Sequence, residues 1–187
     1  MKEVASVINR AFGRNLESDD IYVHVTQPEV VYLLRQQEKI VAMASYNVRK
    51  FADIESLVVE GIAVAPEMQG KGVFKTITDY ALNGERVVCL RTQNPRMYRA
   101  LEKYCAETYP GEKDRPVITK AITLDFAKYL KCNIDGNGVV KGYYGGLFYG
   151  QEPHHSKVDS LFQKLGVNLH EGDGLLVVGE TLQPKCF

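Results

Sequence analysis

The fold is decided by the stretch VEGIAVAPEMQGKGVFKTI, residues 59–77. Residues 57–65 form a nearly continuous apolar run, LVVEGIAVA, which is typical of a strand covered on both faces and therefore central in its sheet. Pro66 ends this run, and from Val73 onward the apolar residues recur at helical spacing. Gly70 and Gly72 lie between the two patterns. The stretch therefore predicts a strand, a short glycine loop and a helix.

A strand, loop and helix in this order predict an anion site, because backbone N–H groups and the positive end of the helix dipole converge on one point. A phosphate is the most natural anion there. Gly70 and Gly72 allow a ligand to approach the main chain without a Cβ in the way. Lys71 and Lys75 either add positive charge or are simply solvated residues at the helix start.

Two familiar phosphate loops fit this segment poorly. A P-loop requires glycine where QGKGVFKT has Gln69 and Phe74. A dinucleotide fingerprint requires a third glycine where GKGVFK ends on Lys75, and it requires a leading βαβ unit in place of the antiparallel strands expected upstream. Both classes of nucleotide loop are therefore disfavoured.

The quoted stretch resembles the acetyl-coenzyme A loop of the GCN5-related N-acetyltransferases (GNAT), [QR]-x-x-G-x-[GA] after a central strand that ends in AV-P. Gln69 and Gly72 match this signature, and Phe74 stands where the family usually has a small residue. A bulky residue there is expected to shift the pyrophosphate or to narrow the mouth of the site.

A second resemblance covers residues 92–103, TQNPRMYRALEK, which are similar to the family's cofactor element N-x-x-A-x-x-L-Y-E-K. Asn94, Glu102 and Lys103 are in register with it. Leu101 occupies the position at which many members carry the tyrosine that protonates the departing thiolate. The resemblance covers residues 1–105 in element order, and the C-terminal part only loosely.

The resemblance implies an α+β fold with α/β/α layers, in which helices cover both faces of a mixed, mainly antiparallel central sheet. It implies acetyl-CoA (acyl-CoA) as cosubstrate, with no metal. The main chain of residues 62–64 would pair with pantetheine like an extra strand, and the amides of residues 70–74 would hold the pyrophosphate. The implied cofactor-binding residues are Ile62, Ala63, Val64, Gln69, Gly70, Lys71, Gly72, Val73, Phe74 and Asn94.

Glu60 is the candidate general base, because it is a carboxylate inside a mostly apolar strand. Burial would raise the pKa of its carboxyl toward the working range. The alternative is a structural acid paired with an arginine or lysine of a neighbouring strand. With Leu101 at the usual tyrosine position, the acid must come from Tyr98, Tyr104 or elsewhere. Tyr98, one turn back on roughly the same face, is the catalytic candidate, and packing in the core is its alternative.

The first half of the chain outside this stretch also has a readable pattern. An amphipathic helix is expected from Val4 to Phe12, and a short helix within the loop at 17–27. The polar turn QQEK predicts a hairpin between residues 30–35 and 39–51. The helix that begins at Val73 is expected to bury Tyr80, and a short strand at 87–90 then precedes a helix over NPRMYRALEKYC.

The second half is less regular. One further strand is expected between residues 106 and 151, where PVITKAITLDFAKYL reads as strand turning into helix. Ser156 is expected to cap a helix that ends at Gly166, and a final strand begins at Leu175. The chain is expected to be a single domain, 1–187, with the cofactor motifs in 1–105 and divergent strands and a helix in 106–187.

Composition narrows the partners. The 187 residues carry 23 basic and 23 acidic side chains, so no overall cationic field gathers nucleic acid or a membrane surface. Four widely spaced cysteines without a CxxC pair or secretory signal indicate a reducing cytoplasm rather than a disulfide framework. His154 and His155 are expected to be solvated loop residues or to line a substrate pocket. Metal binding there is disfavoured, because His24 and His170 have no ligand spacing to them.

The leading functional hypothesis is an acetyl-CoA-dependent N-acetyltransferase that acts by direct attack, with general-base assistance, on a primary amine of a small molecule or a polypeptide. The alternative is a catalytically degenerate CoA-binding or regulatory module of the same fold. A nucleotide-binding protein is a third hypothesis. Dimers are common in proteins of this type, so a homodimer is among the assemblies that the resemblance allows.

Overall fold

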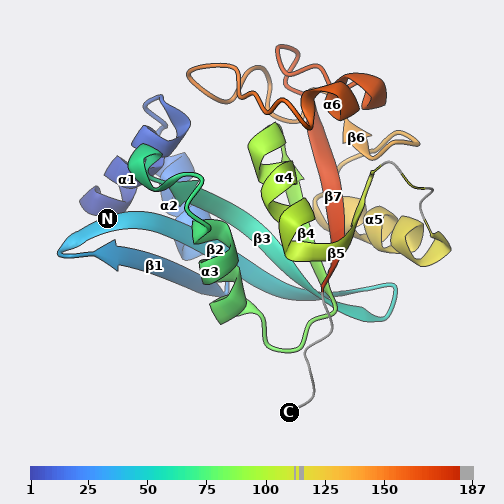
Figure 1. The fold of residues 1–187 in the computed structure, drawn as a ribbon, viewed down its shortest axis with the longest axis horizontal. Coiled ribbons are helices and arrows are strands. Elements are labelled where there is room, and N and C mark those ends of the chain that lie inside the picture. The colour runs from blue at the N-terminus through green and yellow to red at the C-terminus, as the bar shows by residue number, and fades with distance from the viewer. Residues whose placement is uncertain (112, 114–115, 182–187) are drawn as a thin grey trace. The chain divides into compact units, whose positions relative to one another are not determined.

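The computed structural model of the protein describes residues 1–111, 113 and 116–181 (Figure 1). Its elements follow the chain as α1 (Lys2–Phe12), α2 (Ser18–Thr26), β1 (Val30–Gln36), β2 (Lys39–Phe51), β3 (Ile54–Val64), the 3-10 turn η1 (Pro66–Met68), α3 (Val73–Ala81), β4 (Val87–Thr92), α4 (Pro95–Tyr104), β5 (Cys105–Tyr109), α5 (Val117–Tyr129), β6 (Val139–Val140), α6 (Asp159–Leu165) and β7 (Gly174–Thr181).

These elements form two compact units. The first comprises Met1–Val48, Leu57–Asn83 and Tyr149–Gln151. The second comprises Arg49–Ser56, Gly84–Phe148 and the described residues from Glu152 onward. The expectation of one 1–187 domain stays a prediction.

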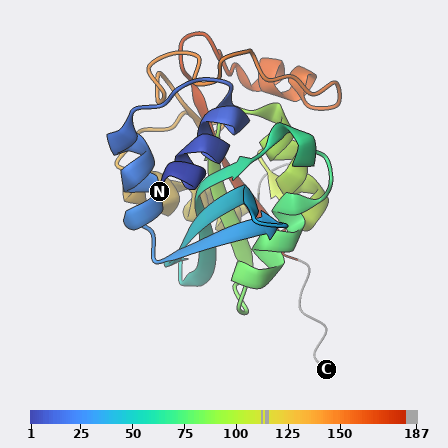
Figure 2. The ribbon, with the colours of Figure 1, turned by 90° about the vertical axis from the view of Figure 1, so that its left-hand side faces the viewer.

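In the first unit, β1 and β2 form the expected antiparallel hairpin, with Val30 opposite Tyr46 and Gln36 opposite Lys39. Helices α1 and α2 pack on this sheet (Figure 2). Their contact with it is an apolar cluster of Val4, Val7, Ile8, Ile21, Ile40, Val41, Met43, Ala63 and Ala65. Helix α1 ends as predicted at Gly13, which adopts the left-handed conformation with φ of 66°.

Helix α3 packs on the opposite face of the same strands. The Tyr46 hydroxyl lies 3.1 Å from Thr78 Oγ1, and the Tyr32 hydroxyl donates to the carbonyl of Tyr80 at 3.1 Å. Alternate residues of a strand point to opposite faces, so Tyr46 faces away from the Val41 and Met43 side chains that meet α1 and α2. Helices therefore cover both faces of the first unit's strands.

The expectation that Tyr80 is buried in α3 is wrong. Its side chain is 76% exposed. The buried residues of α3 are Val73, Phe74, Ile77 and Thr78, so burial stops one turn before the helix ends at Ala81. Tyr80 has the helical spacing of the buried face from Val73, but it lies in the last turn, beyond the buried residues.

In the second unit, β7 is the central strand. It pairs antiparallel with β4, from Val87 opposite Glu180 to Thr92 opposite Leu175, and also with β5 and β6. Cys105, the first residue of β5, packs closely on β7 at Gly179, where an added Cβ would lie 2.4 Å from the Cys105 sulfur and 3.2 Å from Leu101 Cγ of α4. Only glycine fits there, which explains the glycine inside the predicted strand LLVVGE.

Two expectations for the second half of the chain are corrected. PVITKAITLDFAKYL contains no described strand, because α5 spans Val117–Tyr129 and begins directly after Pro116. Its buried residues, Thr119, Ile122, Thr123, Phe126 and Ala127, follow the helical period despite the β-branched composition. The region contains two short strands, β5 and β6, where one was expected.

Ser156 is not the cap of α6. The helix begins at Asp159 with Val158 at the N-cap, and the Asp159 carboxylate accepts a hydrogen bond from the backbone N–H of His155 at 2.9 Å. An acidic side chain in the first turn thus binds the N–H of the preceding loop in place of the expected serine cap. Gly166 ends the helix as predicted.

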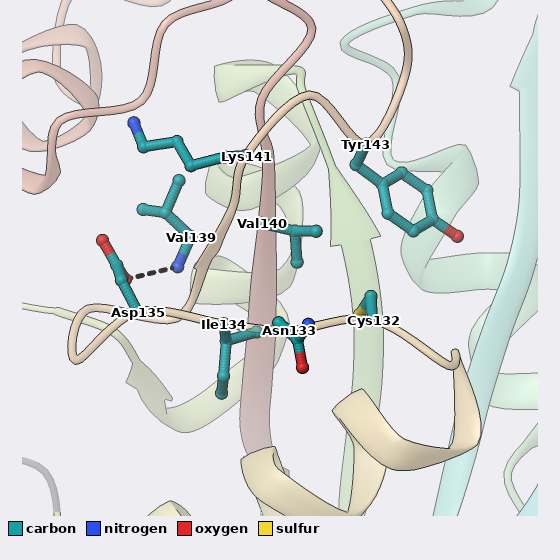
Figure 3. A pocket seen from close by; sticks show the side chains of 8 residues that line it. All are labelled: Cys132, Asn133, Ile134, Asp135, Val139, Val140, Lys141 and Tyr143. Carbon is teal, nitrogen blue, oxygen red and sulfur yellow. Dashed lines mark hydrogen bonds between the residues drawn. The ribbon is translucent and has the colours of Figure 1, made fainter.

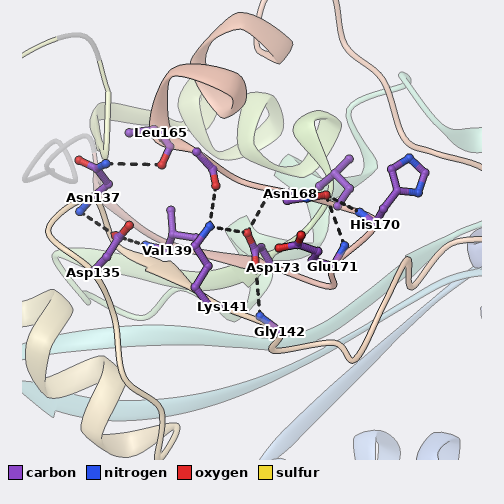
Figure 4. Close-up of polar contacts among 12 residues, drawn as sticks. Asp135, Asn137, Val139, Lys141, Gly142, Leu165, Asn168, His170, Glu171 and Asp173 are labelled. Atoms are coloured by element: carbon purple, nitrogen blue, oxygen red, sulfur yellow. Dashed lines mark hydrogen bonds and ion pairs between the residues drawn. The ribbon is translucent and has the colours of Figure 1, made fainter.

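Two buried polar side chains organise the loops of the second unit. The Gln93 amide nitrogen donates to the carbonyls of Gly146 and Leu169 at 3.1 and 2.9 Å, and its oxygen accepts from the N–H of Phe148 at 2.8 Å. The Asp173 carboxylate accepts from Lys141 Nζ and from two backbone N–H groups (Figure 4). The Gln93 carboxamide and the Asp173 carboxylate therefore each bind both the loop at 141–148 and the loop at 168–169.

The expected fold class is confirmed. The described residues contain seven strands and six α-helices in an α+β arrangement, and all the strand pairs specified above are antiparallel. No helix in this part of the chain combines the length and the apolar character needed to cross a bilayer. Three of the four cysteines, Cys89, Cys105 and Cys132, are free thiols, and Cys186 lies outside the described residues.

Candidate active site

The glycine loop of the first unit has the geometry that the sequence predicts. Strand β3 ends at Val64, and α3 begins at Val73. Between them Gly70 and Gly72 have φ values of 76° and 78°, in the left-handed region that favours glycine. A Cβ added at either glycine would meet nothing within 4 Å. The loop therefore presents its main chain on an open side.

The N-terminus of α3 carries no side-chain cap. Gly72 is its N-cap residue, and the first backbone bond of the helix runs from the N–H of Thr76 to the carbonyl of Gly72 at 3.1 Å. The amides of the first turn have no acceptor within the helix, and the helix dipole places partial positive charge there. This terminus, which no serine, threonine, aspartate or asparagine caps, suits a phosphate.

The two lysines of the loop differ in their surroundings. Lys71 is exposed beside Gly70 and Gly72. Lys75 Nζ lies 2.6 Å from Asp79 Oδ2, one turn along α3. The charge of Lys75 is thus partly balanced within the helix, which makes Lys71 the better candidate for binding an anion.

Gln69 shapes the loop. Its side-chain nitrogen donates to the carbonyl of Val64 at 3.0 Å, which links the loop to the last residue of β3. The Gln69 side chain therefore fixes the distance between the end of the strand and the glycines.

Of the three residues expected to pair with pantetheine, Ala63 is buried, whereas Ile62 and Val64 are half-buried.

Phe74 does not occupy the open side of the loop. Its side chain is 7% exposed and belongs to the buried stripe of α3 with Val73. The aromatic ring that replaces the family's small residue is accommodated in the core. The expected narrowing of the site by Phe74 therefore finds no support in its burial.

Glu60 lies on β3, four residues before the end of the strand, and is half-buried. Its Oε1 accepts a hydrogen bond from Asn47 Nδ2 of β2 at 2.9 Å. The partner that β2 supplies is a neutral carboxamide, and the structural alternative of a cationic partner on a neighbouring strand stays a prediction. Sequence reasoning missed Asn47, although an asparagine in the mostly apolar run VAMASYNV signals a buried polar group that needs partners.

Asn94 and Tyr98 belong to the second unit. Asn94 caps α4, with its Oδ1 accepting from the N–H of Arg96 at 2.9 Å. The Tyr98 side chain is 1% exposed, and its hydroxyl donates to the carbonyl of Pro110 at 2.6 Å. Its ring packs edge-on against Phe162. These surroundings favour the packing alternative, and the acid role of Tyr98 stays a prediction.

Comparison with known proteins decides the family. The family model described as the acetyltransferase (GNAT) family matches residues 3–106, more than half of the chain. The chain belongs to the GNAT acetyltransferase family. No curated protein sequence matches it.

The solved structures that resemble this chain include acetyltransferases. The ribosomal-protein-S18-alanine N-acetyltransferase from Escherichia coli is 12% identical, with 100% of this chain and 91% of that chain covered and a TM-score of 0.48. The IAA acetyltransferase from Bacillus cereus is 16% identical, with 94% and 90% covered and a TM-score of 0.48. An aminoglycoside 6'-N-acetyltransferase complexed with coenzyme A is 8% identical, with 98% and 91% covered and a TM-score of 0.48.

Membership in the family makes this protein an acetyltransferase with acetyl-CoA as its acyl donor. The open glycine loop and the uncapped N-terminus of α3 fit the diphosphate of that donor, since both present main-chain donors to an anion. Within the described residues, no group of three or more histidine, cysteine, aspartate or glutamate side chains is placed to hold a metal ion.

The histidines of the acetyltransferase have local partners. His154 Nδ1 lies 2.5 Å from Asp159 Oδ2 at the start of α6, and its carbonyl accepts from Arg96 Nε at 3.0 Å. His170 Nε2 lies 2.9 Å from Glu152 Oε2. His154 is 74% exposed, as expected of a solvated loop histidine, whereas His155 is half-buried.

A separate hollow lies in the second unit, between the end of α5 and β6 (Figure 3). Cys132 and Lys141 are among its lining residues. Burial raises the pKa of the Cys132 thiol above its ordinary value, so the thiolate that a nucleophile requires is disfavoured. Lys141 Nζ is bonded to Asp173 at 2.7 Å. This hollow therefore presents no activated group for acyl transfer.

Proposed function

We propose that this acetyltransferase transfers an acetyl group from acetyl-CoA to the primary amine of a small molecule or polypeptide, with Glu60 as general base. The observation that carries the proposal is the continuity of one short segment. Glu60, the main chain of residues 62–64 and the uncapped glycine loop follow one another along β3 and into α3. A base and an anion site are therefore held by the same strand and the same helix.

The donor supplies a thioester whose carbonyl carbon bonds to the amine nitrogen as the carbon–sulfur bond breaks and coenzyme A leaves as a thiolate. Glu60 takes the proton that the attacking nitrogen loses, directly or through water. The loop amides and Lys71 bind the diphosphate, and Gln69 holds the loop at the end of β3. Tyr98 is the predicted source of the proton that the thiolate receives.

The proposal is tested in two steps. Calorimetric titration with acetyl-CoA measures binding, and release of free thiol in the presence of a panel of primary amines measures transfer. We expect saturable binding and thiol release that depends on one class of amine. Absence of heat at millimolar acetyl-CoA would contradict the assignment of the glycine loop, and binding without amine-dependent thiol release would contradict the transfer reaction.

A degenerate CoA-binding module is the second candidate function. The specific observation in its favour is that Leu101 replaces the usual tyrosine, while the Tyr98 hydroxyl is already bonded to the Pro110 carbonyl. Both features leave Tyr104 as the remaining tyrosine of α4 that could supply the acid.

Tyr98→Phe separates the two roles of this tyrosine. If Tyr98 only packs, the loss of its hydrogen bond to the Pro110 carbonyl costs about 1 kcal/mol of unfolding free energy, and turnover stays within about twofold of wild type. If Tyr98 is the acid, turnover falls about 100-fold or more with the same stability cost. Urea unfolding and thiol-release kinetics on one preparation measure both quantities.

A further inference from the structure

We propose that Asn47 is a positioning residue for the reaction, holding the Glu60 carboxylate in its working orientation. This inference rests on the proposed role of Glu60 as general base. Asn47 lies on β2 and is 7% exposed, and its Nδ2 donates to Glu60 Oε1 at 2.9 Å. A carboxylate on a flexible side chain gains a fixed direction from such a bond, because its rotation then breaks a charge-assisted hydrogen bond.

The orientation of the Asn47 carboxamide is set by a second bond. Its Oδ1 accepts from the backbone N–H of Glu29 at 2.8 Å. A backbone N–H is always a donor, so it must face the oxygen of the carboxamide and not the nitrogen. The nitrogen is then directed at Glu60, where the carboxylate is the matching acceptor. The two contacts agree on a single orientation of the carboxamide.

Glu29 is itself fixed at two points. Its backbone N–H binds Asn47 Oδ1, and its carboxylate accepts from the backbone N–H of Val48 at 3.0 Å. Two bonds thus join Glu29, just before β1, to consecutive residues of β2. The donor that orients Asn47 is therefore tied to β2 at two points, and the bond from Asn47 to Glu60 connects this segment to β3.

The consequence for catalysis follows from the chemistry of the carboxamide. Asn47 is neutral and presents a donor to Glu60, so it favours the ionised carboxylate without competing for the amine's proton. A cationic partner in the same place would stabilise the carboxylate far more strongly and weaken it as a base. A carboxamide in this place therefore orients the carboxylate while lowering its basicity less than a cation in the same place would.

A double-mutant cycle tests the coupling. With acetyl-CoA and the best amine of the panel, we expect Asn47→Ala to lower kcat about tenfold and to leave KM for acetyl-CoA unchanged. A tenfold loss is a part of the roughly 10²–10⁴-fold that a general base contributes. In the Glu60→Gln background the same substitution should change kcat less than about twofold, because no base remains to be positioned. Equal losses in both backgrounds would overturn the inference and leave the proposed function intact.

Two further variants guard against a purely structural effect. Asn47→Asp keeps the shape and the acceptor for the Glu29 N–H but removes the donor to Glu60, so it should lose at least as much kcat as Asn47→Ala; wild-type kcat would overturn the inference. Asn9→Ala is the matched control, because Asn9 Oδ1 accepts from the N–H of Leu16 at 3.0 Å. It should lose similar stability with kcat unchanged.

A substrate-free signal completes the test. The side-chain amide protons of Asn47 should resonate differently in wild type and Glu60→Gln, because the acceptor changes from a charged to a neutral oxygen. An unchanged amide signal would show that the bond is absent in solution and would overturn the inference. Unchanged kcat in Glu60→Gln would instead remove the base from the proposed function, and the inference with it.

Discussion

At the scale of single residues, the acetyltransferase uses glycine where backbone geometry requires it. Gly70 and Gly72 both have positive φ and open space where a Cβ would lie. Substituting either therefore strains the backbone without a clash inside the protein. Any loss of ligand binding beyond that strain must come from the ligand's own contact with the added Cβ.

Gly72→Ala is expected to weaken acetyl-CoA binding about tenfold or more, and to cost about 1–2 kcal/mol of unfolding free energy through left-handed strain. Gly84→Ala is the matched control, because Gly84 also has positive φ, at 100°, with no contact for an added Cβ, and lies outside the loop. The control should lose similar stability with unchanged affinity in calorimetry. Equal affinity in the two variants would contradict a close approach of the ligand to Gly72.

Asp173 is a residue whose charge stabilises the fold. Burial raises the pKa of its carboxyl, but the hydrogen bond from Lys141 and the N–H groups of Asn168 and Gly142 outweigh burial and hold the pKa below the ordinary aspartate value. A carboxyl whose pKa is lower in the folded state contributes stability above its unfolded pKa, about 3.9. That contribution is lost as pH falls through the folded pKa.

Asp173→Asn should therefore lower the unfolding free energy at neutral pH by about 2–4 kcal/mol, because it removes a buried, hydrogen-bonded charge. The difference from wild type should shrink as pH falls below about 4. Urea unfolding across this pH range measures both. Asp53→Asn, on a side chain that is 97% exposed, should change stability little at any pH.

At the scale of elements, local patterns predicted most of the helices and strands correctly. The hairpin of β1 and β2, helices α1, α3 and α4, and strand β7 all follow from periodicity and from glycine, proline and cap residues. The misses have tertiary causes. Helix α5 is rich in β-branched residues, and only its packing pattern reveals a helix.

Part of the candidate site was also predictable from local sequence patterns. The glycine loop is contiguous in sequence, so its residues were predicted together. Asn47 lies 13 residues from Glu60, on another strand, and its role depends on strand pairing that no local motif encodes. Gln93 was missed likewise, because its partners come from loops far along the chain.

Helix α4 gives a prediction at this scale. Asn94→Ala should cost about 1 kcal/mol of unfolding free energy, because the N–H of Arg96 loses its cap. Asn94→Asp keeps a side-chain acceptor and should restore stability. If Asn94 serves only as the cap, acetyl-CoA affinity will be the same in all three proteins. A loss of affinity in Asn94→Asp would instead indicate that the carboxamide binds the cofactor.

At the scale of the whole molecule, the 23 basic and 23 acidic residues cancel, so long-range repulsion between copies is weakest near neutral pH. Helix α5 adds exposed apolar side chains, with Val117 84% and Leu124 54% exposed. Both features favour weak self-association at pH 7. The expectation of a homodimer must be separated from this nonspecific attraction.

Static light scattering makes that separation. We expect apparent attraction between wild-type molecules at pH 7 that falls at pH 9, where net negative charge develops. Lys120→Glu, on an exposed position of α5, changes the net charge from zero to minus two and should weaken attraction at pH 7 in the same way. Association that changes neither with pH nor with this substitution would indicate a specific dimer.

Gln93 couples the loop that contains Gly146 and Phe148 to the loop that contains Leu169, so neither loop can be redesigned alone. One carboxamide binds the main chain at Gly146, Phe148 and Leu169, so a change of length in either loop removes an anchor from the other. Loop grafting into this acetyltransferase will need to exchange both segments at once, with glutamine kept at the end of β4.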